Sequence, residues 1–266
     1  MFIYPLTTFS RLGIILLTMQ KLDLTNRQIA ILKAVVEEYT VKGEPVGSEL
    51  IEKKYKIGAS PATIRNEMVE LAKKGYLSKS YFSSGRIPTA KAFRFYINHL
   101  LKPKELSTAE EVSLKNNIWD ERKELHRLLK QATRTLSEST KLLSISITDE
   151  GDFYYSGFSN ILLFREFLEK NDLVHLVERF EDESFWARVL RRIEKLEADL
   201  MYLLGEEDFP DPMLHECASV FAEFEGENVK GAIGVVGPKR MYYGEIMPKV
   251  KYLSSLISEI LRESGY

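Results

Sequence analysis

The chain has 266 residues, of which 44% are hydrophobic and 29% charged, a composition typical of a globular protein with one large domain or two smaller ones. One cysteine, Cys217, excludes an internal disulfide framework and suits a reducing, cytoplasmic environment. The apolar run at residues 12–17 is too short to span a membrane, so no membrane function is expected. Residues 1–21 are expected to form either an arm or an over-long gene start, because well-organised sequence begins at Leu22.

The net charge of −2 hides two halves of opposite sign. Residues 1–104 contain 17 Lys and Arg against 8 Asp and Glu, a net charge of +9. The remainder contains 20 against 31, a net charge of −11. This asymmetry predicts an N-terminal part that faces nucleic acid and an acidic part that stays away from phosphate. The alternative is a chance scatter of surface charge.

The N-terminal part is predicted to contain three helices in succession. Thr25 opens a capping box before the first helix, and Gly43 ends it. A short second helix follows at residues 47–55. Ser60 is the N-cap of the third helix, Pro61 takes its first position, and Gly75 ends it.

A hairpin and a further helix follow the third helix. Residues 76–82 are β-prone, residues 83–86 form a turn, and residues 87–88 lead out of it. Thr89 then caps a helix that runs to Leu100. Three helices and a hairpin are the order of a winged helix-turn-helix, in which the second helix of the pair enters the major groove of DNA. This domain is predicted to cover residues 22–102.

The helical phase of the third helix separates a core face from an outer face. At about 100° per residue, Ile64, Met68 and Leu71 lie together and predict the buried side. The opposite side carries Ala62, Thr63, Asn66, Val69 and Lys73, with Arg65 at its flank.

These outer residues predict a DNA-binding surface. Arg, Asn and Thr side chains can contact base edges in the major groove, so Thr63, Arg65 and Asn66 are the expected base contacts. The expected phosphate or minor-groove contacts from the helix and the hairpin are Ser60, Lys73, Lys79, Ser83, Ser84 and Arg86. For any single residue, the alternative is an ordinary solvent-exposed side chain.

The rest of the chain predicts a linking helix and then an α+β domain with a mainly antiparallel sheet. Residues 103–142 are interpreted as one long amphipathic linking helix, which either pairs two chains or packs on its own domain. The domain at 143–266 is predicted to contain two hairpins and three helical segments. The hairpins are expected at 143–155 and 218–236, and the helices at about 161–180, 184–204 and 243–262.

No enzymatic or metal site is predicted. The histidines His99, His126, His175 and His215 are far apart and have no metal-ligand spacing. The pair His215 and Cys217 is too small a set for a metal site, and phosphate-binding glycine motifs are missing. The acidic run at residues 206–208 is interpreted as a solvent-exposed turn. The chain is therefore expected to be neither an enzyme nor dependent on a cofactor.

Several motifs resemble those of the heat-inducible transcription repressor HrcA family. The N-terminal matches are GEPVGS at 43–48, SPATIRNEM at 60–68 and SSGRIPT at 83–89. The C-terminal matches are GFSN at 157–160 and GPKRMYY at 237–243. The chain is shorter than the members of that family, with the shortfall between Lys141 and Gly157.

The resemblance implies a repressor of chaperone genes that binds an inverted-repeat operator as a homodimer. It also implies a GAF-like C-terminal domain and the GroE chaperonin as a partner. Because of the shortfall, a reduced GAF-like domain without the family's inserted dimerising domain is expected. The alternative function is a winged-helix regulator whose C-terminal domain binds a small metabolite.

Overall fold

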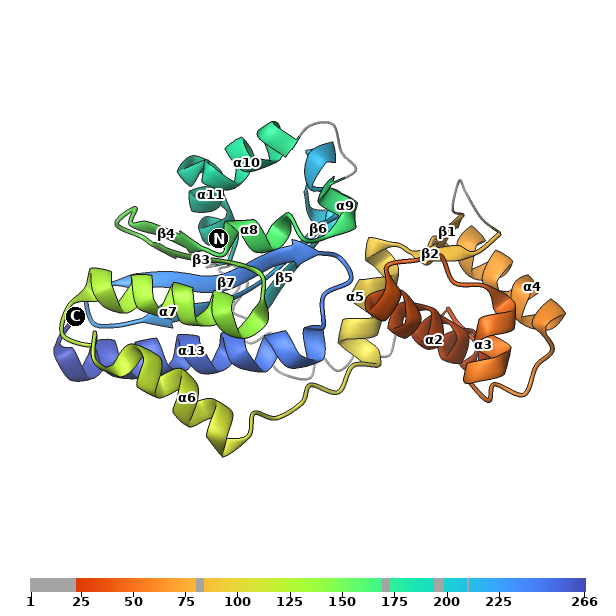
Figure 1. Ribbon diagram of the computed structural model, residues 1–266, viewed down its shortest axis with the longest axis horizontal. Coiled ribbons are helices and arrows are strands. Elements are labelled where there is room, and N and C mark those ends of the chain that lie inside the picture. Colours follow the sequence, from red (N-terminus) through yellow and green to blue (C-terminus); the bar gives the residue numbers. More distant parts are fainter. Residues whose placement is uncertain (1–22, 80–83, 169–172, 194–198, 210) are drawn as a thin grey trace, which may run out of the picture.

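The computed structural model describes residues 23–79, 84–168, 173–193, 199–209 and 211–266. Figure 1 shows two units side by side: an N-terminal unit of helices with a small hairpin, and a larger C-terminal unit built on a sheet. An extended segment after the N-terminal unit connects them. The predicted arm or gene start at 1–21 and the hairpin residue Ser83 lie outside the described residues.

The N-terminal unit follows the predicted order of elements. Its local signals act as expected: the Thr25 side chain accepts a hydrogen bond from the Gln28 N–H at 3.2 Å, and Gly43 ends the first helix at a φ of 67°. Ser60 and Thr89 cap the third and fourth helices in the same way. The elements are α2 (Asn26–Lys42), α3 (Ser48–Lys54), α4 (Pro61–Lys73), β1 (Leu77–Lys79), β2 (Arg86–Pro88) and α5 (Ala90–His99).

The described strands of the C-terminal unit form one antiparallel sheet of five strands, in the order β4-β3-β7-β6-β5. Both predicted hairpins are confirmed: β3 pairs with β4, and β6 pairs with β7. The α+β prediction is therefore confirmed. The strands are β3 (Leu143–Thr148), β4 (Phe153–Ser156), β5 (Met201–Leu204), β6 (Cys217–Glu225) and β7 (Lys230–Pro238).

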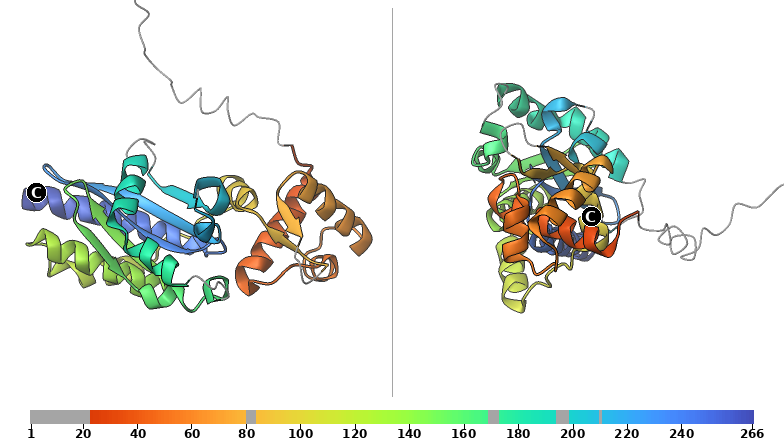
Figure 2. Two further views of the ribbon diagram at one scale, coloured as in Figure 1. Left: turned by 90° about the horizontal axis from the view of Figure 1, so that it is seen from above. Right: turned by 90° about the vertical axis from the view of Figure 1, so that its right-hand side faces the viewer.

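Helices cover both faces of this sheet (Figures 1 and 2). The helices α7 and α13 lie on one face, and α8 and α11 contact the other. The second face is filled by an aromatic cluster that includes Phe180, Trp186 and Phe221, each at most 2% exposed. The helices are α6 (Thr108–Trp119), α7 (Leu125–Thr140), α8 (Phe158–Ile161), α9 (Arg165–Leu168), α10 (Leu173–Glu181), α11 (Glu183–Ile193), α12 (Gly205–Asp208) and α13 (Tyr243–Ser264), with a short 3-10 turn at Pro212–Leu214.

The prediction of one long linking helix is wrong. The chain turns between Trp119 and Leu125, so that α6 packs against α7 and α13. Leu114 and Ile118 of α6 and Leu128 of α7 are buried by this arrangement. A continuous helix would have left these apolar side chains in water. The structure thus favours the alternative in which this segment packs on its own domain.

The predicted helix over 184–204 is also wrong at its C-terminal end. Residues Met201–Leu204 form the edge strand β5, which pairs with β6. Leucine and methionine are good helix formers, so their local preference does not reveal a strand that exists because of pairing with a distant segment. The predicted helix over 161–180 is likewise divided among short helices in the described residues.

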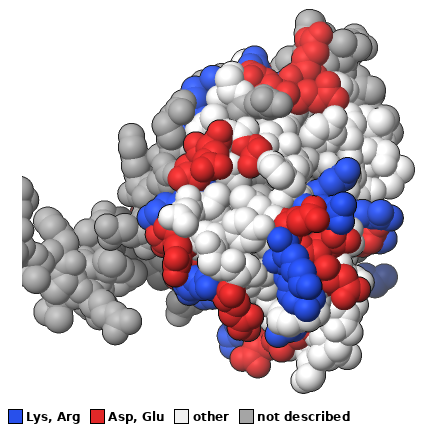
Figure 3. Space-filling model, turned by 90° about the vertical axis from the view of Figure 1, so that its left-hand side faces the viewer, with Lys and Arg blue, Asp and Glu red and all other residues white. Residues whose placement is uncertain are grey.

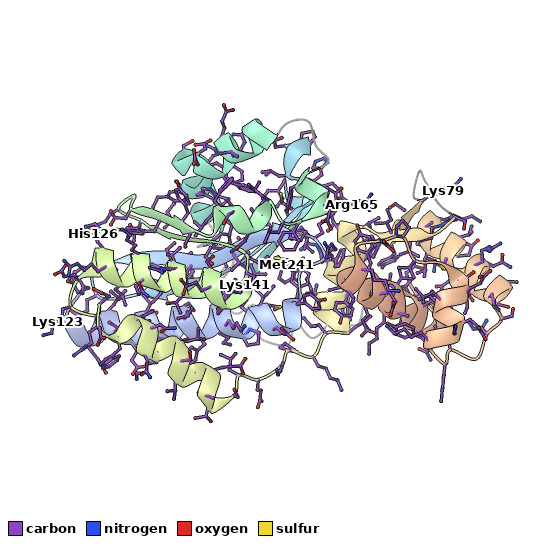
Figure 4. The ribbon with its side chains drawn as sticks, viewed as in Figure 1. Lys79, Lys123, His126, Lys141, Arg165 and Met241 are labelled. Carbon is purple, nitrogen blue, oxygen red and sulfur yellow. The ribbon has the colours of Figure 1, made fainter. Side chains whose placement is uncertain are left out.

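Reciprocal arginine contacts join the two units, and we call them the arginine latches. Arg94 of α5 forms ion pairs with Glu207 and Asp208 of α12. In the opposite direction, Arg240 of the C-terminal unit pairs with Glu166 and donates a hydrogen bond to the Thr40 carbonyl of α2 at 3.3 Å. Figure 4 shows Arg165 and Met241, which neighbour the second latch in sequence, on the side of the C-terminal unit that faces the N-terminal unit.

The acidic run at 206–208, predicted to be a solvent-exposed turn, forms the short helix α12, in which Glu206 and Glu207 are exposed as predicted but all three carboxylates contact the N-terminal unit. Asp208 has a side chain only 9% exposed, and Glu206 accepts a hydrogen bond from the Ala90 N–H at the start of α5. Glu206 also pairs with Lys239 at 3.1 Å. These carboxylates hold the last helix of the N-terminal unit against the sheet domain.

Candidate nucleic-acid interface

The helix α4 presents the predicted two faces. Ile64, Met68 and Leu71 are at most 3% exposed and pack into the core of the N-terminal unit. On the opposite side, Arg65 and Asn66 are exposed, and neither makes an ion pair or a hydrogen bond with another described residue. A guanidinium and an amide without intramolecular partners are free to bind an external acceptor or donor.

The N-terminus of α4 is set by Ser60. Its hydroxyl accepts a hydrogen bond from the Thr63 N–H at 3.2 Å and lies 3.0 Å from the Thr63 hydroxyl. Pro61 occupies the first turn, where its missing N–H costs nothing. Thr63 therefore lies on the first turn beside the cap, with its side chain half-buried.

Two polar contacts brace α4 against α2. Gln28 donates a hydrogen bond to Glu67 at 3.0 Å, and Arg27 lies 3.5 Å from the same carboxylate. Glu67 is the residue after Asn66, so the contact fixes the helix without occupying its outer face. The exposed side chains are thus carried on a rigid support, which favours a defined binding geometry.

The hairpin is fixed to the helices by a third extended segment. Val46 and Arg86 exchange two backbone hydrogen bonds of 2.9 Å, so residue 46 extends the β1–β2 pair. Gly85 lies so close to Pro45 that a side chain at position 85 would meet it at 2.9 Å. The β2 side of the hairpin is consequently held beside the start of α3.

The other predicted contacts fall into three groups. Lys79 and Ser84 are exposed on the hairpin, and Figure 4 shows Lys79 at its outer side. Lys73 is also exposed, but it forms an ion pair with Glu70 at 2.7 Å on the same helix. Arg86 starts β2 and donates hydrogen bonds to the carbonyls of Ser84 and Gly85, so its guanidinium is folded onto its own turn.

Two hollows flank the outer face of α4. One lies beside Thr63, Asn66 and Val69, and the other is shared by α4, the start of α3 and the hairpin. The second hollow includes Ser48 and Glu49, which the sequence analysis did not select. Their signal was that Ser48 is the last residue of the GEPVGS motif and Glu49 follows it directly.

The far end of the C-terminal unit has a different surface. Figure 3 shows acidic groups spread over this end, with Lys and Arg interspersed and a broad uncharged area between them. This agrees with the acidic balance of the C-terminal part of the sequence. On net charge, the N-terminal part of the chain at +9 is better suited to a polyanion than the remainder at −11.

The described part of the chain has no metal-binding cluster and no membrane-spanning helix. No group of three or more His, Cys, Asp and Glu side chains there is arranged to hold a metal ion, and Cys217 is buried. None of the helices described combines the length and the hydropathy of a membrane span.

Comparison with known proteins identifies the family. The model of the HrcA protein C-terminal domain matches residues 63–247. The chain belongs to the HrcA family. This confirms the resemblance in the sequence, and the expectation of a transcription regulator rather than an enzyme agrees with this family.

Relatives named heat-inducible transcription repressor HrcA match to different extents. The protein from Lysinibacillus sphaericus is 41% identical over 122 residues, which is 46% of this chain but only 36% of that protein. The protein from Syntrophobacter fumaroxidans is 25% identical in an alignment of 346 residues that covers 91% of this chain and 99% of the relative. Since this chain has 266 residues, it is a shortened member of the family.

A solved structure supports the fold. The crystal structure of a hypothetical protein superimposes with a TM-score of 0.73, covering 91% of this chain and 99% of that chain at 19% sequence identity. At this identity the match supports the arrangement of helices and strands and carries no statement about activity.

Proposed function

We propose that this HrcA-family protein is a cytoplasmic, sequence-specific DNA-binding repressor of heat-shock (chaperone) genes. The observation that carries the proposal is the outer face of α4, where Arg65 and Asn66 are exposed and unpartnered among the described residues. The names of the relatives, heat-inducible transcription repressors, support the same function.

We interpret α3, α4 and the β1–β2 hairpin as a winged helix-turn-helix, with α4 as the recognition helix. The short connection between α3 and α4, the bracing of α4 by α2 and the fixed hairpin support this interpretation. Thr63 and Asn66 are the proposed base contacts, while Ser60, Lys79 and Ser84 are placed to meet phosphates on either side. Lys73 can join them only after its ion pair with Glu70 opens.

We further propose that the protein binds an inverted-repeat operator as a homodimer, because two half-sites supply the contact area that a single small domain lacks. The helices α7 and α13 bury their apolar faces within the chain, so these faces are not open to a second copy. The GroE chaperonin is carried over from the family as a proposed partner. The C-terminal unit is the proposed reduced GAF-like domain, without the family's inserted dimerising domain.

The alternative function, a regulator whose C-terminal domain binds a metabolite, gains no support from the described residues. The sheet face opposite α7 and α13 is closed by aromatic packing, with the Trp186 indole N–H donating to the Phe180 carbonyl at 2.8 Å. A pocket on this face would require these side chains to move apart.

The proposal is tested by titrating the full chain with a labelled inverted-repeat operator from upstream of a chaperonin operon, beside a scrambled duplex. We expect the operator to bind on the order of 10³-fold more tightly. Asn66→Ala is expected to reduce operator affinity by about tenfold or more and to relax the base preference at one position, since a good bidentate base contact contributes about 1–3 kcal/mol. Fluorescence anisotropy at fixed salt measures both quantities.

Asn117→Ala is the matched control, because Asn117 is also exposed on a helix but belongs to the C-terminal unit. Its operator affinity should equal that of the unchanged protein. Equal binding of operator and scramble by the unchanged chain would contradict the proposed function.

A further inference from the structure

The hollow between α3, α4 and the hairpin is lined by more basic than acidic side chains of the described residues. It has a volume of about 140 Å³, room for a group the size of several water molecules. Arg65 of α4 and Arg86 of β2 both line it. Two arginines from separate elements therefore border one concave place.

The Arg86 guanidinium is held in position, and some of its hydrogen-bond donors are not used by any described residue. The backbone of Arg86 is fixed by its paired hydrogen bonds with Val46, and the side chain donates to the Ser84 and Gly85 carbonyls at 3.2 and 3.3 Å. Its Nε is buried and meets no acceptor among the described residues. Both of these hydrogen bonds come from Nη1, and Nη2 makes none with a described residue, so this preorganised group keeps Nη2 donors for a further acceptor.

The only carboxylate that lines this hollow among the described residues belongs to Glu49. Glu49 is exposed and forms no ion pair with Arg65 or Arg86. The two arginines thus leave the hollow with a net positive charge when it is empty of partners from outside. An anion with several oxygen acceptors fits this arrangement best.

We propose that the hollow binds one phosphate group of the DNA backbone, with Arg86 and Arg65 as its two ligands. The inference rests on the proposed function and assigns these arginines a different role from base reading. The phosphates border the groove that a recognition helix enters, so a contact at the flank of α4 meets the backbone. A guanidinium folded onto its own turn also reaches less far than the floor of a minor groove requires.

The test compares variants of the full chain on the operator and on the scrambled duplex over a range of salt concentrations. Arg86→Ala is expected to weaken binding to both duplexes by about tenfold, the effect of losing one charge-assisted hydrogen bond. The ratio of the two affinities should stay unchanged. The slope of log affinity against log salt should fall by about one for each subunit bound.

Further variants separate charge from a merely structural role of Arg86. Arg86→Lys keeps the charge and should retain most of the salt slope. Arg65→Ala breaks no ion pair or hydrogen bond with another described residue, so it should reproduce the uniform loss of affinity without lowering the melting temperature. Glu49→Gln should strengthen binding to both duplexes, and Arg262→Ala, an exposed arginine at the far end of α13, should change neither.

If Arg86→Ala and Arg65→Ala weakened binding to the operator but not to the scrambled duplex, the proposal would be overturned, because that result indicates that these arginines contact bases. Unchanged binding of both duplexes by Arg86→Ala and Arg65→Ala would overturn it too. If the proposed function is wrong, the unchanged protein will bind the operator and the scrambled duplex equally. The phosphate contact can still be tested in that case, by comparing the affinity of the unchanged protein and of Arg86→Ala for the scrambled duplex.

Discussion

At the scale of single residues, Glu38 shows how a buried charge fixes the N-terminal unit. Its side chain is 1% exposed and lies between α2 and α3. Lys54 pairs with one carboxylate oxygen, and the Tyr55 hydroxyl donates to the same oxygen at 2.9 Å. Lys42 lies 3.7 Å from the other oxygen. The end of α3 is thereby tied to α2, which keeps the following turn and α4 in place.

The ionisation of Glu38 makes this tie dependent on pH. Burial alone would raise the pKa of the carboxyl, but the hydrogen bonds from Lys54 and Tyr55 and the charges of Lys54 and Lys42 lower it below its ordinary value. A lowered pKa stabilises the folded state above the ordinary carboxyl pKa of about 4, and this stabilisation disappears as the pH falls through the folded value.

We expect Glu38→Gln to reduce the free energy of unfolding by about 2 kcal/mol near neutral pH, because it removes a buried carboxylate and leaves Lys54 without its partner. The difference from the unchanged protein should shrink in acid, where Glu38 becomes protonated. Urea denaturation at several pH values measures it. Glu37→Gln is the control: this neighbour is 34% exposed and 3.8 Å from Lys33, so its loss should cost less than about 0.5 kcal/mol. Equal effects of the two variants would contradict the assigned role of Glu38.

At the scale of elements, the turn after β4 depends on one glycine. Gly157 has a φ of 79°, and a side chain there would lie 1.9 Å from the Ser137 hydroxyl of α7. Asn160 donates to that hydroxyl at 3.3 Å and to the Leu142 carbonyl at 3.2 Å. The GFSN motif therefore fixes the β3–β4 hairpin onto α7, which gives this family motif a structural explanation.

Gly157→Ala is expected to lower the free energy of unfolding by about 3 kcal/mol, because it combines backbone strain with a clash against α7. Gly151→Ala provides the comparison, since Gly151 has a φ of 97° but nothing within 4 Å of the added methyl group. That variant should lose only about 1 kcal/mol, the cost of the strained backbone. Thermal denaturation followed by circular dichroism would reject the explanation if both glycines behaved alike.

Prediction from sequence succeeded where the signals are local. The caps at Thr25, Ser60 and Thr89 define helices within a few residues of themselves, so the N-terminal elements and the outer face of α4 could be predicted. The strand β5 and the turn between α6 and α7 depend on packing against distant segments, and their residues carry no local sign of it. The phosphate hollow was missed for the same reason, since it requires the pairing of Val46 with Arg86.

At the scale of the whole molecule, the arginine latches make the two units behave as one. In the latch from the C-terminal unit, an ion pair within that unit, between Arg240 and Glu166 at 17% and 13% exposure, holds the guanidinium that donates across to the Thr40 carbonyl. Arg240 also lies over the Phe164 ring at 5.6 Å and fills the space beside Gly43. An ion pair so well shielded from water is weakened little by salt, and breaking it leaves a charge without compensation.

Arg240→Ala is therefore expected to destabilise the protein by about 2 kcal/mol and to speed hydrogen exchange at the end of α2 and in α9. The measurement is hydrogen exchange read by mass spectrometry, together with the melting temperature. Arg134→Ala removes an exposed ion pair within α7 and should cost less than about 0.5 kcal/mol. Unchanged exchange at the junction in Arg240→Ala would show that the latch does not hold the units together.

The latches also bear on the operator that such a protein can use. A DNA-binding head on a loose tether can swivel to follow half-sites that are rotated or displaced along the duplex. Here α5 and the end of α2 are anchored to the sheet domain, so a dimer would carry its recognition helices at a fixed distance and angle. If the spacing between two half-sites changes by half of a helical turn of about 10 base pairs, the half-sites lie on opposite sides of the double helix. Such a dimer could then bind only one of them at a time.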